Sequence, residues 1–315
     1  MPPINTVLGP IAADQLGFTL CHEHIWVSSA GIQHTFPDFA DREGALRIAV
    51  EHLRAARAGG IQTIIDVTTH DLGRDITFYC EAAEQSGMQI VACTGIWLDI
   101  PRVFASATPD QIARLYIREI EVGIEGTGIK AGVIKVATDG DVSPANETVL
   151  RAAARAQKAT GVPVTTHTNS VQQNGGQQVR IFQDEGVDMS RVCIGHSNDT
   201  LDTAYLEGLL ASGAYLGMDH YTLEPRPNRP TWQQKTDVLR DMIQKGYANR
   251  LMLSHDWVPI TAVGAPRPVP PQSPPSDGYL MISRHVLPYL RQLGVAESEI
   301  ATIMVDNPRR FFGRV

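Results

Sequence analysis

Hydrophobic residues recur along the chain in short runs that alternate with longer amphipathic segments. The short runs are rich in β-branched residues and lack strict alternation, which is typical of strands buried on both faces of a parallel sheet. The longer segments carry apolar residues at helical spacing, and several are preceded by a capping residue and followed by glycine. The predicted strands cover residues 16–26, 63–68, 90–96, 132–137, 162–168, 192–196, 214–219 and 251–256.

A predicted helix follows each of these strands. Eight strand–helix units in a row predict a (β/α)8 TIM barrel, as a single domain over residues 1–315. An open doubly wound sheet is the alternative, but no G-x-G-x-x-G turn follows the first strand. The predicted helices cover residues 42–58, 75–86, 109–126, 144–160, 177–185, 201–211, 231–245 and 279–293, and short helices follow at 296–304 and 307–312.

The composition of the chain limits the kinds of binding partner that we expect. It has 315 residues, 43% of them hydrophobic, and a net charge of -7 without a dense Lys/Arg run. These values argue against nucleic acid or an anionic membrane as a partner and leave a small-molecule substrate. The four cysteines form no C-x-x-C pair, and residues 1–6 lack the features of a secretory signal. We therefore expect a cytoplasmic protein with buried, unpaired cysteines.

Polar side chains stand at the carboxyl ends of several predicted strands. His22 and His24 end the first strand, and alternation along a strand turns both to one face and Glu23 to the other. In a barrel, the carboxyl ends of the strands meet at the rim where chemistry takes place. A single histidine there is more often structural, but groups on several strands indicate a site. The other strand ends contribute Lys135, His167, His196, Asp219 with His220, and His255 with Asp256.

These nitrogen and oxygen ligands favour zinc or a similar divalent ion. They exceed the three or so protein ligands of one catalytic zinc, so we expect two ions. Two cations need an anionic bridge. Lys135 lies in an apolar strand, where a lysine can be neutral and can add carbon dioxide to form a carbamate with two oxygens. The alternative is a buried lysine paired with Asp66, Asp139 or Asp219.

The sequence resembles the phosphotriesterase family of the amidohydrolase superfamily nearly from end to end. The resemblance implies that His22 and His24 hold a buried ion and that His167 and His196 hold a more exposed one. Carbamylated Lys135 and a hydroxide would bridge the two ions; zinc is expected, and cobalt, manganese or iron would also suit such ligands. The segments that carry the resemblance are 5–7, 17–20, 22–24, 73–75, 132–138, 163–168, 194–197, 255–257 and 306–308.

The resemblance also implies roles for three further residues and an oligomeric state. Asp256 would bind the buried ion and accept a proton from the hydroxide. His220 and Asp199 would carry that proton outward. The other interpretations are a helix cap or loop anchor for Asp256 and a structural hydrogen bond for His220 and Asp199. A homodimer is implied as well.

The substrate signals in the sequence conflict. Trp97 and His220 resemble the triesterases of the family, whereas the short connection 221–230 resembles its lactonases. Trp257 supplies apolar surface, and the proline-dense segment 258–276 predicts a stiff loop over the barrel mouth that matches neither group. We expect a phosphotriesterase that hydrolyses organophosphate triesters. One alternative is a lactonase for N-acyl-homoserine or other lactones with promiscuous phosphotriesterase activity, and another is an inactive barrel that binds a partner.

Overall fold

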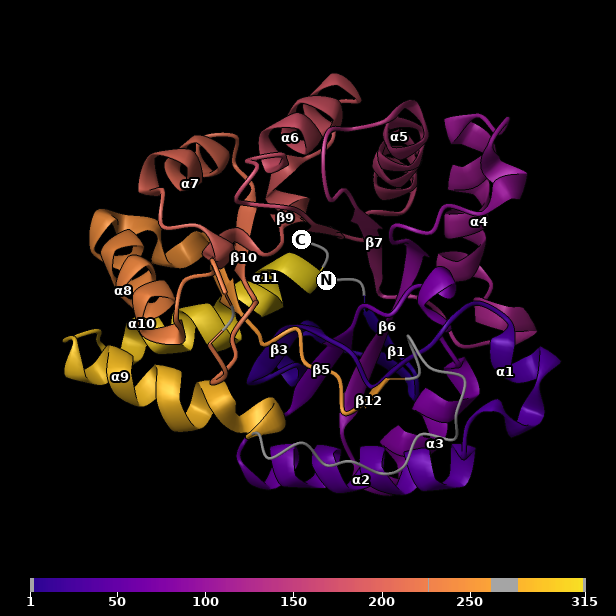
Figure 1. The fold of residues 1–315 in the computed structure, drawn as a ribbon, viewed down its shortest axis with the longest axis horizontal. Helices are drawn as coiled ribbons and strands as arrows, with labels where there is room; N and C mark the ends of the chain where they lie inside the picture. The colour runs from indigo at the N-terminus through magenta and orange to yellow at the C-terminus, as the bar shows by residue number, and fades with distance from the viewer. Residues whose placement is uncertain (1–2, 226, 262–276, 314–315) are drawn as a thin grey trace.

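The computed structural model describes residues 3–225, 227–261 and 277–313. Eight parallel strands lie side by side in the order β11-β10-β9-β8-β7-β6-β5-β3, and helices surround them (Figure 1). The two ends of this order meet, because the N–H of Asp256 donates to the carbonyl of His22 over 3.2 Å. The sheet is therefore a nearly closed barrel. The predicted (β/α)8 fold is confirmed, and the doubly wound alternative is wrong.

The barrel strands are short, and each lies between two other strands of the barrel. Two small sheets lie outside the barrel: an antiparallel pair formed by β1 (Ile4–Thr6) and β2 (Gly9–Ile11), and a parallel pair formed by β4 (Trp26–Val27) and β12 (Ile260–Thr261). The barrel strands are β3 (Thr19–Glu23), β5 (Thr63–Asp66), β6 (Gln89–Ile96), β7 (Val133–Ala137), β8 (Val164–His167), β9 (Val192–Ile194), β10 (Tyr215–Met218) and β11 (Leu251–Leu253).

The surrounding helices begin and end at the signals that the sequence carries. Ser143 caps α5 by accepting the N–H of Asn146, and Gly161 ends this helix with φ 72°,. The α-helices are α1 (Ile32–Thr35), α2 (Arg42–Ala58), α3 (Ile76–Ser86), α4 (Pro109–Glu121), α5 (Pro144–Thr160), α6 (Gly175–Asp184), α7 (Thr203–Leu210), α8 (Trp232–Met242), α9 (Leu287–Gln292), α10 (Glu297–Ala301) and α11 (Asn307–Phe312).

Several predicted elements are longer than the observed ones. The strand predicted for 16–26 is divided between β3 and the start of β4, because the N–H of His24 turns to the carbonyl of Trp257 instead of a neighbouring barrel strand. The helix predicted for 109–126 ends at Glu121, shortly before Gly123 with φ 150°. Most of the proline-dense segment 258–276 lies outside the described residues, so its predicted placement over the mouth stays a prediction.

Two apolar layers hold the barrel together. One lies between the strands and the outer helices, and the other fills the barrel interior below the mouth. Cys21, Cys93 and Cys193 belong to the inner layer, where all three are buried and unpaired, as predicted. This layer forms an apolar floor beneath the strand ends. Among the described residues, no helix is long and apolar enough to cross a membrane.

Candidate metal centre

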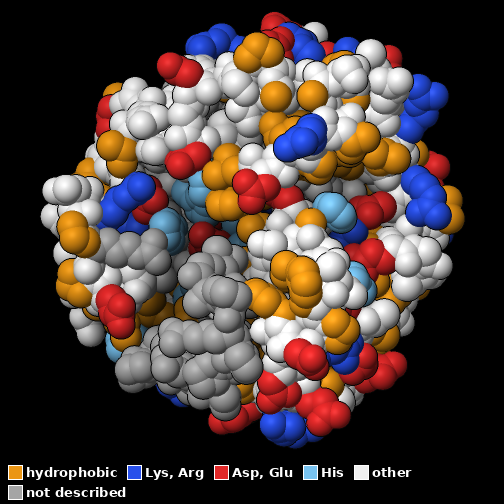
Figure 2. All heavy atoms as spheres, turned by 45° about the vertical axis from the view of Figure 1, so that its right-hand side comes forward, with side chains coloured by type: hydrophobic (Ala, Val, Ile, Leu, Met, Phe, Trp, Pro, Cys, Tyr) orange, Lys and Arg blue, Asp and Glu red, His pale blue; other side chains and the backbone are white. Residues whose placement is uncertain are grey.

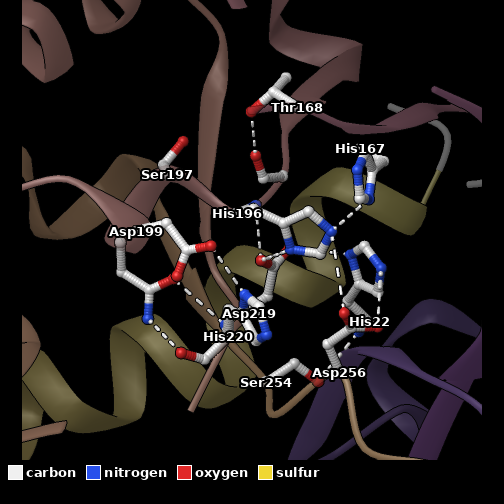
Figure 3. A network of polar contacts seen from close by, with 12 residues as sticks. His22, His167, Thr168, His196, Ser197, Asp199, Asp219, His220, Ser254 and Asp256 are labelled. Atoms are coloured by element: carbon white, nitrogen blue, oxygen red, sulfur yellow. Dashed lines mark hydrogen bonds and ion pairs between the residues drawn. The ribbon is translucent and has the colours of Figure 1, made fainter. Parts of the chain in front are cut away.

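The predicted ligands come together at the carboxyl ends of the strands. His22 lies near the end of β3, Lys135 lies in β7, and His167 is the last residue of β8. His196 and Asp256 follow β9 and β11, and both adopt left-handed backbone angles, with φ 54° and 55°. Figure 3 shows the side chains of His22, His167, His196 and Asp256 turned toward one another. In the space-filling view, histidine side chains are visible in a hollow of this face (Figure 2).

The first ligand group consists of His22, His24 and Asp256. Oδ1 of Asp256 lies 3.0 Å from Nε2 of His24 and 3.5 Å from Nε2 of His22. The other ring nitrogen of each histidine is occupied, because Nδ1 of His22 contacts Asp219 at 2.9 Å and Nδ1 of His24 contacts the hydroxyl of Thr68 at 2.8 Å. The two Nε2 atoms are therefore left to face the carboxylate, an arrangement that suits a divalent ion.

The second group lies beside the first and contains His167 and His196. Nδ1 of His167 faces Nε2 of His196 at 2.7 Å, and this Nε2 lies 3.8 Å from Oδ2 of Asp256. Burial and the neighbouring His196 lower the pKa of His167 well below its usual value. A neutral imidazole offers its lone pair to a metal, so this low pKa favours ligation.

Asp219 orients one histidine from each group. Its Oδ2 contacts Nδ1 of His22 at 2.9 Å, and its Oδ1 accepts both Nδ1–H of His196 at 3.0 Å and the backbone N–H of His196 at 2.6 Å. Burial alone would raise the pKa of Asp219, but the two histidines hold it well below its usual range. Asp219 is therefore a buried anion that turns two Nε2 atoms toward the mouth.

Sequence reasoning placed Asp219 among the polar groups at the strand ends and considered it as a possible partner of Lys135, but not as a partner of two histidines. A carboxylate directly after a strand and before His220 was the available signal, but its two histidine partners are distant in the sequence. The pairing depends on the barrel bringing β3, β9 and β10 to one rim.

Lys135 lies at the centre of the site. Its Nζ is 2.9 Å from Nε2 of His22, and the residue is 1% exposed. No carboxylate of the described residues forms an ion pair with it, so the alternative pairing with Asp66, Asp139 or Asp219 is absent. Asp66 instead accepts the backbone N–H groups of Ile25 and Thr68. Burial lowers the pKa of Lys135, which favours the neutral amine,.

His220 and Asp199 form a second layer beside His196. Nδ1 of His220 contacts Oδ2 of Asp199 at 2.8 Å, and its ring lies 5.2 Å from that of His196. Asp199 also accepts hydrogen bonds from Arg229 at 3.0 Å and from Lys235 at 2.7 Å. Burial opposes ionisation of Asp199, but His220 and Lys235 hold its pKa well below the usual range.

The two tryptophans named by the sequence lie in different surroundings. The Trp97 ring meets the His167 ring edge-on at 5.7 Å, so it borders the ligand cluster. The Trp257 ring packs against His52 of α2 and Tyr279, with centroid distances of 4.9 and 4.7 Å. Trp97 thus borders the ligand cluster, whereas Trp257 packs between α2 and Tyr279. The predicted substrate contacts of both residues stay predictions.

The donor set fits divalent metal ions. Ligand atoms of His22, His24 and Asp256 all lie within 4.8 Å of one another, as do those of His196, His220 and Asp256. His255, which follows β11 directly before Asp256, does not take part in either group. Its ring turns away from the mouth and contacts Glu23 at 2.6 Å.

Comparison with known proteins identifies the chain. The model of the phosphotriesterase family matches residues 2–312. The chain belongs to the phosphotriesterase family. The predicted resemblance is thereby confirmed, and the ligand cluster lies at the strand ends where that prediction placed it.

Relatives within the phosphotriesterase family carry different names. A phosphotriesterase homology protein of Mycobacterium tuberculosis is 38% identical and covers 100% of this chain and 98% of its own length. An aryldialkylphosphatase of Saccharolobus solfataricus is 37% identical, covering 96% of each chain. An N-acetyltaurine hydrolase of Salmo salar is 27% identical, covering 98% of this chain and 97% of its own. The family is shared, and the named activities differ.

Replacing Asp219 by asparagine tests its orienting role. Asp219→Asn keeps the shape but removes the charge that holds Nδ1–H of His22 and of His196. We expect metal affinity to fall about 10- to 100-fold. Competition with a chromogenic chelator measures the affinity. Asp184→Asn, a change at an exposed carboxylate of the outer helix α6, is the control; equal affinities of the Asp219 variant and the parent protein would contradict the role.

Proposed function

We propose that this protein is a binuclear-metal hydrolase, and that its main activity is hydrolysis of organophosphate triesters. The observation that supports this most is the convergence of four histidines, Lys135 and Asp256 at one barrel mouth in a member of the phosphotriesterase family. Its named relatives are hydrolases, among them the aryldialkylphosphatase.

In this proposal His22, His24 and Asp256 hold the buried ion, and His167 and His196 hold the exposed one. Lys135 lies between the groups and would bridge them as a carbamate. When its amine adds carbon dioxide, a C–N bond forms and one proton leaves, giving an anion with two oxygens. The low pKa of buried Lys135 supports this reaction, since only the neutral amine has a lone pair for carbon dioxide,. Bound ions would supply Lewis-acid activation of water and of the phosphoryl oxygen.

The chain itself supplies the route for the proton. Asp256, 21% exposed at the mouth, would accept the proton of the attacking water. His220 would take it from Asp256, with Asp199 holding the ring through Nδ1. Arg229 and Lys235 keep Asp199 ionised, and a cavity of about 260 Å³ lined by this group lies next to His220. The proton could leave to solvent through that cavity.

The carbamate can be tested without a substrate. Protein supplied with ¹³C-bicarbonate and divalent metal should show a carbamate carbon by NMR, and Lys135→Ala should remove both that signal and at least one bound ion. Lys130→Ala, which changes an exposed lysine, is the control. A parent protein that binds two ions without any carbamate signal would contradict this bridge.

The substrate preference is decided by paired kinetics. We expect kcat/KM for an aryl dialkyl phosphate to exceed that for a panel of N-acyl-homoserine and other lactones, and Asp256→Asn to lower both by about 100- to 10,000-fold. Zinc-, cobalt-, manganese- and iron-loaded protein should be compared. A lactone preference above about tenfold, or about 1.4 kcal/mol of differential transition-state binding, would favour the lactonase alternative.

The Trp97 ring beside His167 supports the phosphotriesterase, because an aromatic wall suits an aryl leaving group,. The lactonase remains the second candidate because the connection between β10 and α8 is short. An inactive barrel is disfavoured by the ligand set.

We also propose a homodimer formed through the segment after β6 and the outer face of α4. Val103 and Leu115 are 76% and 46% exposed there, and with Phe104 they line an apolar cavity of about 340 Å³. Apolar surface of this kind favours association.

We also propose a cytoplasmic location, which fits the four unpaired cysteines,.

Light scattering tests the dimer. The double variant Val103→Glu/Leu115→Glu should have the molar mass of a monomer, because it places charges in the apolar surface. Leu8→Glu, at a similarly exposed residue of the β1–β2 connection, should leave the dimer intact. A dimer that survives the double change would place the interface elsewhere.

A further inference from the structure

Glu23, the last residue of β3, lies between His22 and His24, and its side chain points away from the mouth. The carboxylate of Glu23 is fully buried, with 0% exposure, and lies against the segment after β11. Its Oε1 accepts from Ser254 Oγ at 2.6 Å and from Nδ1 and backbone N of His255 at 2.6 and 2.8 Å. Its Oε2 accepts the N–H of Trp257 at 3.0 Å. These four donors offset the cost of burying the charge.

The backbone donors to Glu23 lie immediately before and after Asp256. The carboxylate therefore fixes the chain on both sides of the proposed metal ligand. Asp256 has φ 55°, a left-handed conformation that L-residues seldom adopt and that persists where the surroundings impose it,. Its own N–H donates to the carbonyl of His22. The β3 segment thus holds Asp256 at three successive backbone positions.

His255 supports Glu23 from the opposite side. The N–H of Ile282 donates to Nε2 of His255 at 3.0 Å, so this nitrogen acts as an acceptor and the proton resides on Nδ1,. That Nδ1–H is the one that donates to Glu23. His255 is 2% exposed, and its two ring nitrogens bond Glu23 and the N–H of Ile282. Its ring connects the carboxylate to the helical segment that begins at Ile282.

The orientation of Asp256 matters because its oxygens face three histidines at once. Oδ1 lies 3.0 Å from His24 and 3.5 Å from His22, and Oδ2 lies 3.8 Å from His196. A rotation of the backbone at Asp256 would move both oxygens together. Displacement of a reacting group by about 1 Å can reduce a rate about 100-fold.

We propose that Glu23 is a positioning residue for Asp256, supported by His255, and that it sets the backbone conformation that directs the Asp256 carboxylate into the metal centre. The role rests on the proposed function, in which Asp256 binds metal and accepts a proton. It explains why one short His-Glu-His segment carries three polar residues. His22 and His24 face the mouth of the barrel, whereas Glu23 bonds the segment that follows β11.

The first test is structural and needs neither metal nor substrate. Glu23→Gln keeps the size of the side chain but directs an NH₂ group toward N–H donors. In crystals of metal-free protein, φ of Asp256 should leave the left-handed region in the variant and stay there in the parent. An unchanged Asp256 conformation in the variant would overturn the proposal.

The second test uses the metal-loaded enzyme. With two ions per chain verified by elemental analysis, Glu23→Gln should lower kcat on the order of 100-fold and change KM by less than about twofold. The double variant Glu23→Gln/Asp256→Asn should be no slower than Asp256→Asn alone, because Glu23 acts through Asp256. Losses that multiply in the double variant would assign Glu23 a separate, general structural role.

Two further variants complete the design. Glu119→Gln breaks a buried ion pair with Arg74, at 2.7 Å, away from Asp256; it should lower thermal stability and keep kcat. His255→Asn removes one bond to Glu23 and serves if Glu23→Gln does not fold; it should lower kcat about tenfold with the same non-additivity, and an unchanged kcat would overturn the proposal. If no phosphate triester or lactone is hydrolysed, the proposed function fails, while the Asp256 conformation still decides the role of Glu23.

Discussion

The metal centre depends on one buried carboxylate that joins two strands. Asp219, at the end of β10, bonds the ring of His22 from β3 and the ring of His196 from β9. A buried anion is stable only with such partners, and a buried imidazole presents one defined nitrogen only when the other is bonded. Each group thereby fixes the other. These contacts involve only the protein's own residues, so Asp219 orients the two rings through hydrogen bonds within the chain.

A second carboxylate performs a similar task on the other side of the mouth. Glu23 faces away from the ligands and bonds the backbone around Asp256. Beyond the end of β11 at Leu253, the N–H of Asp256 still donates to the carbonyl of His22 in β3, but the N–H groups of His255 and Trp257 find their acceptor in the Glu23 side chain. Side-chain acceptors replace the missing ladder. Two of the proposed ligands, His196 and Asp256, have left-handed backbones, and each lies next to one of these buried carboxylates.

The fold and the ligand cluster could be predicted because both follow from local patterns. Alternating apolar runs and capped helices predict eight strand–helix units, and parallel strands must bring their carboxyl ends to one rim. Alternation along β3 correctly turned Glu23 away from the histidines. What the sequence could not predict were contacts between distant strand ends. Asp219 with two histidines, and Glu23 with His255, are separated by 23 to 232 residues, and no local pattern reports such pairs.

The division between strand ends and loops also explains why the family is clear and the substrate is not. The residues that we propose to hold ions and move the proton lie at or just after the strand ends of the barrel, and the family model matches the chain over residues 2–312. Substrate contacts come from connections such as the one between β10 and α8, which vary independently of the barrel. Relatives named for an aryldialkyl phosphate and for N-acetyltaurine share this family over nearly their full length. The side chains at the rim therefore predict hydrolysis, whereas the substrate bond that is cleaved depends on the loops above the rim.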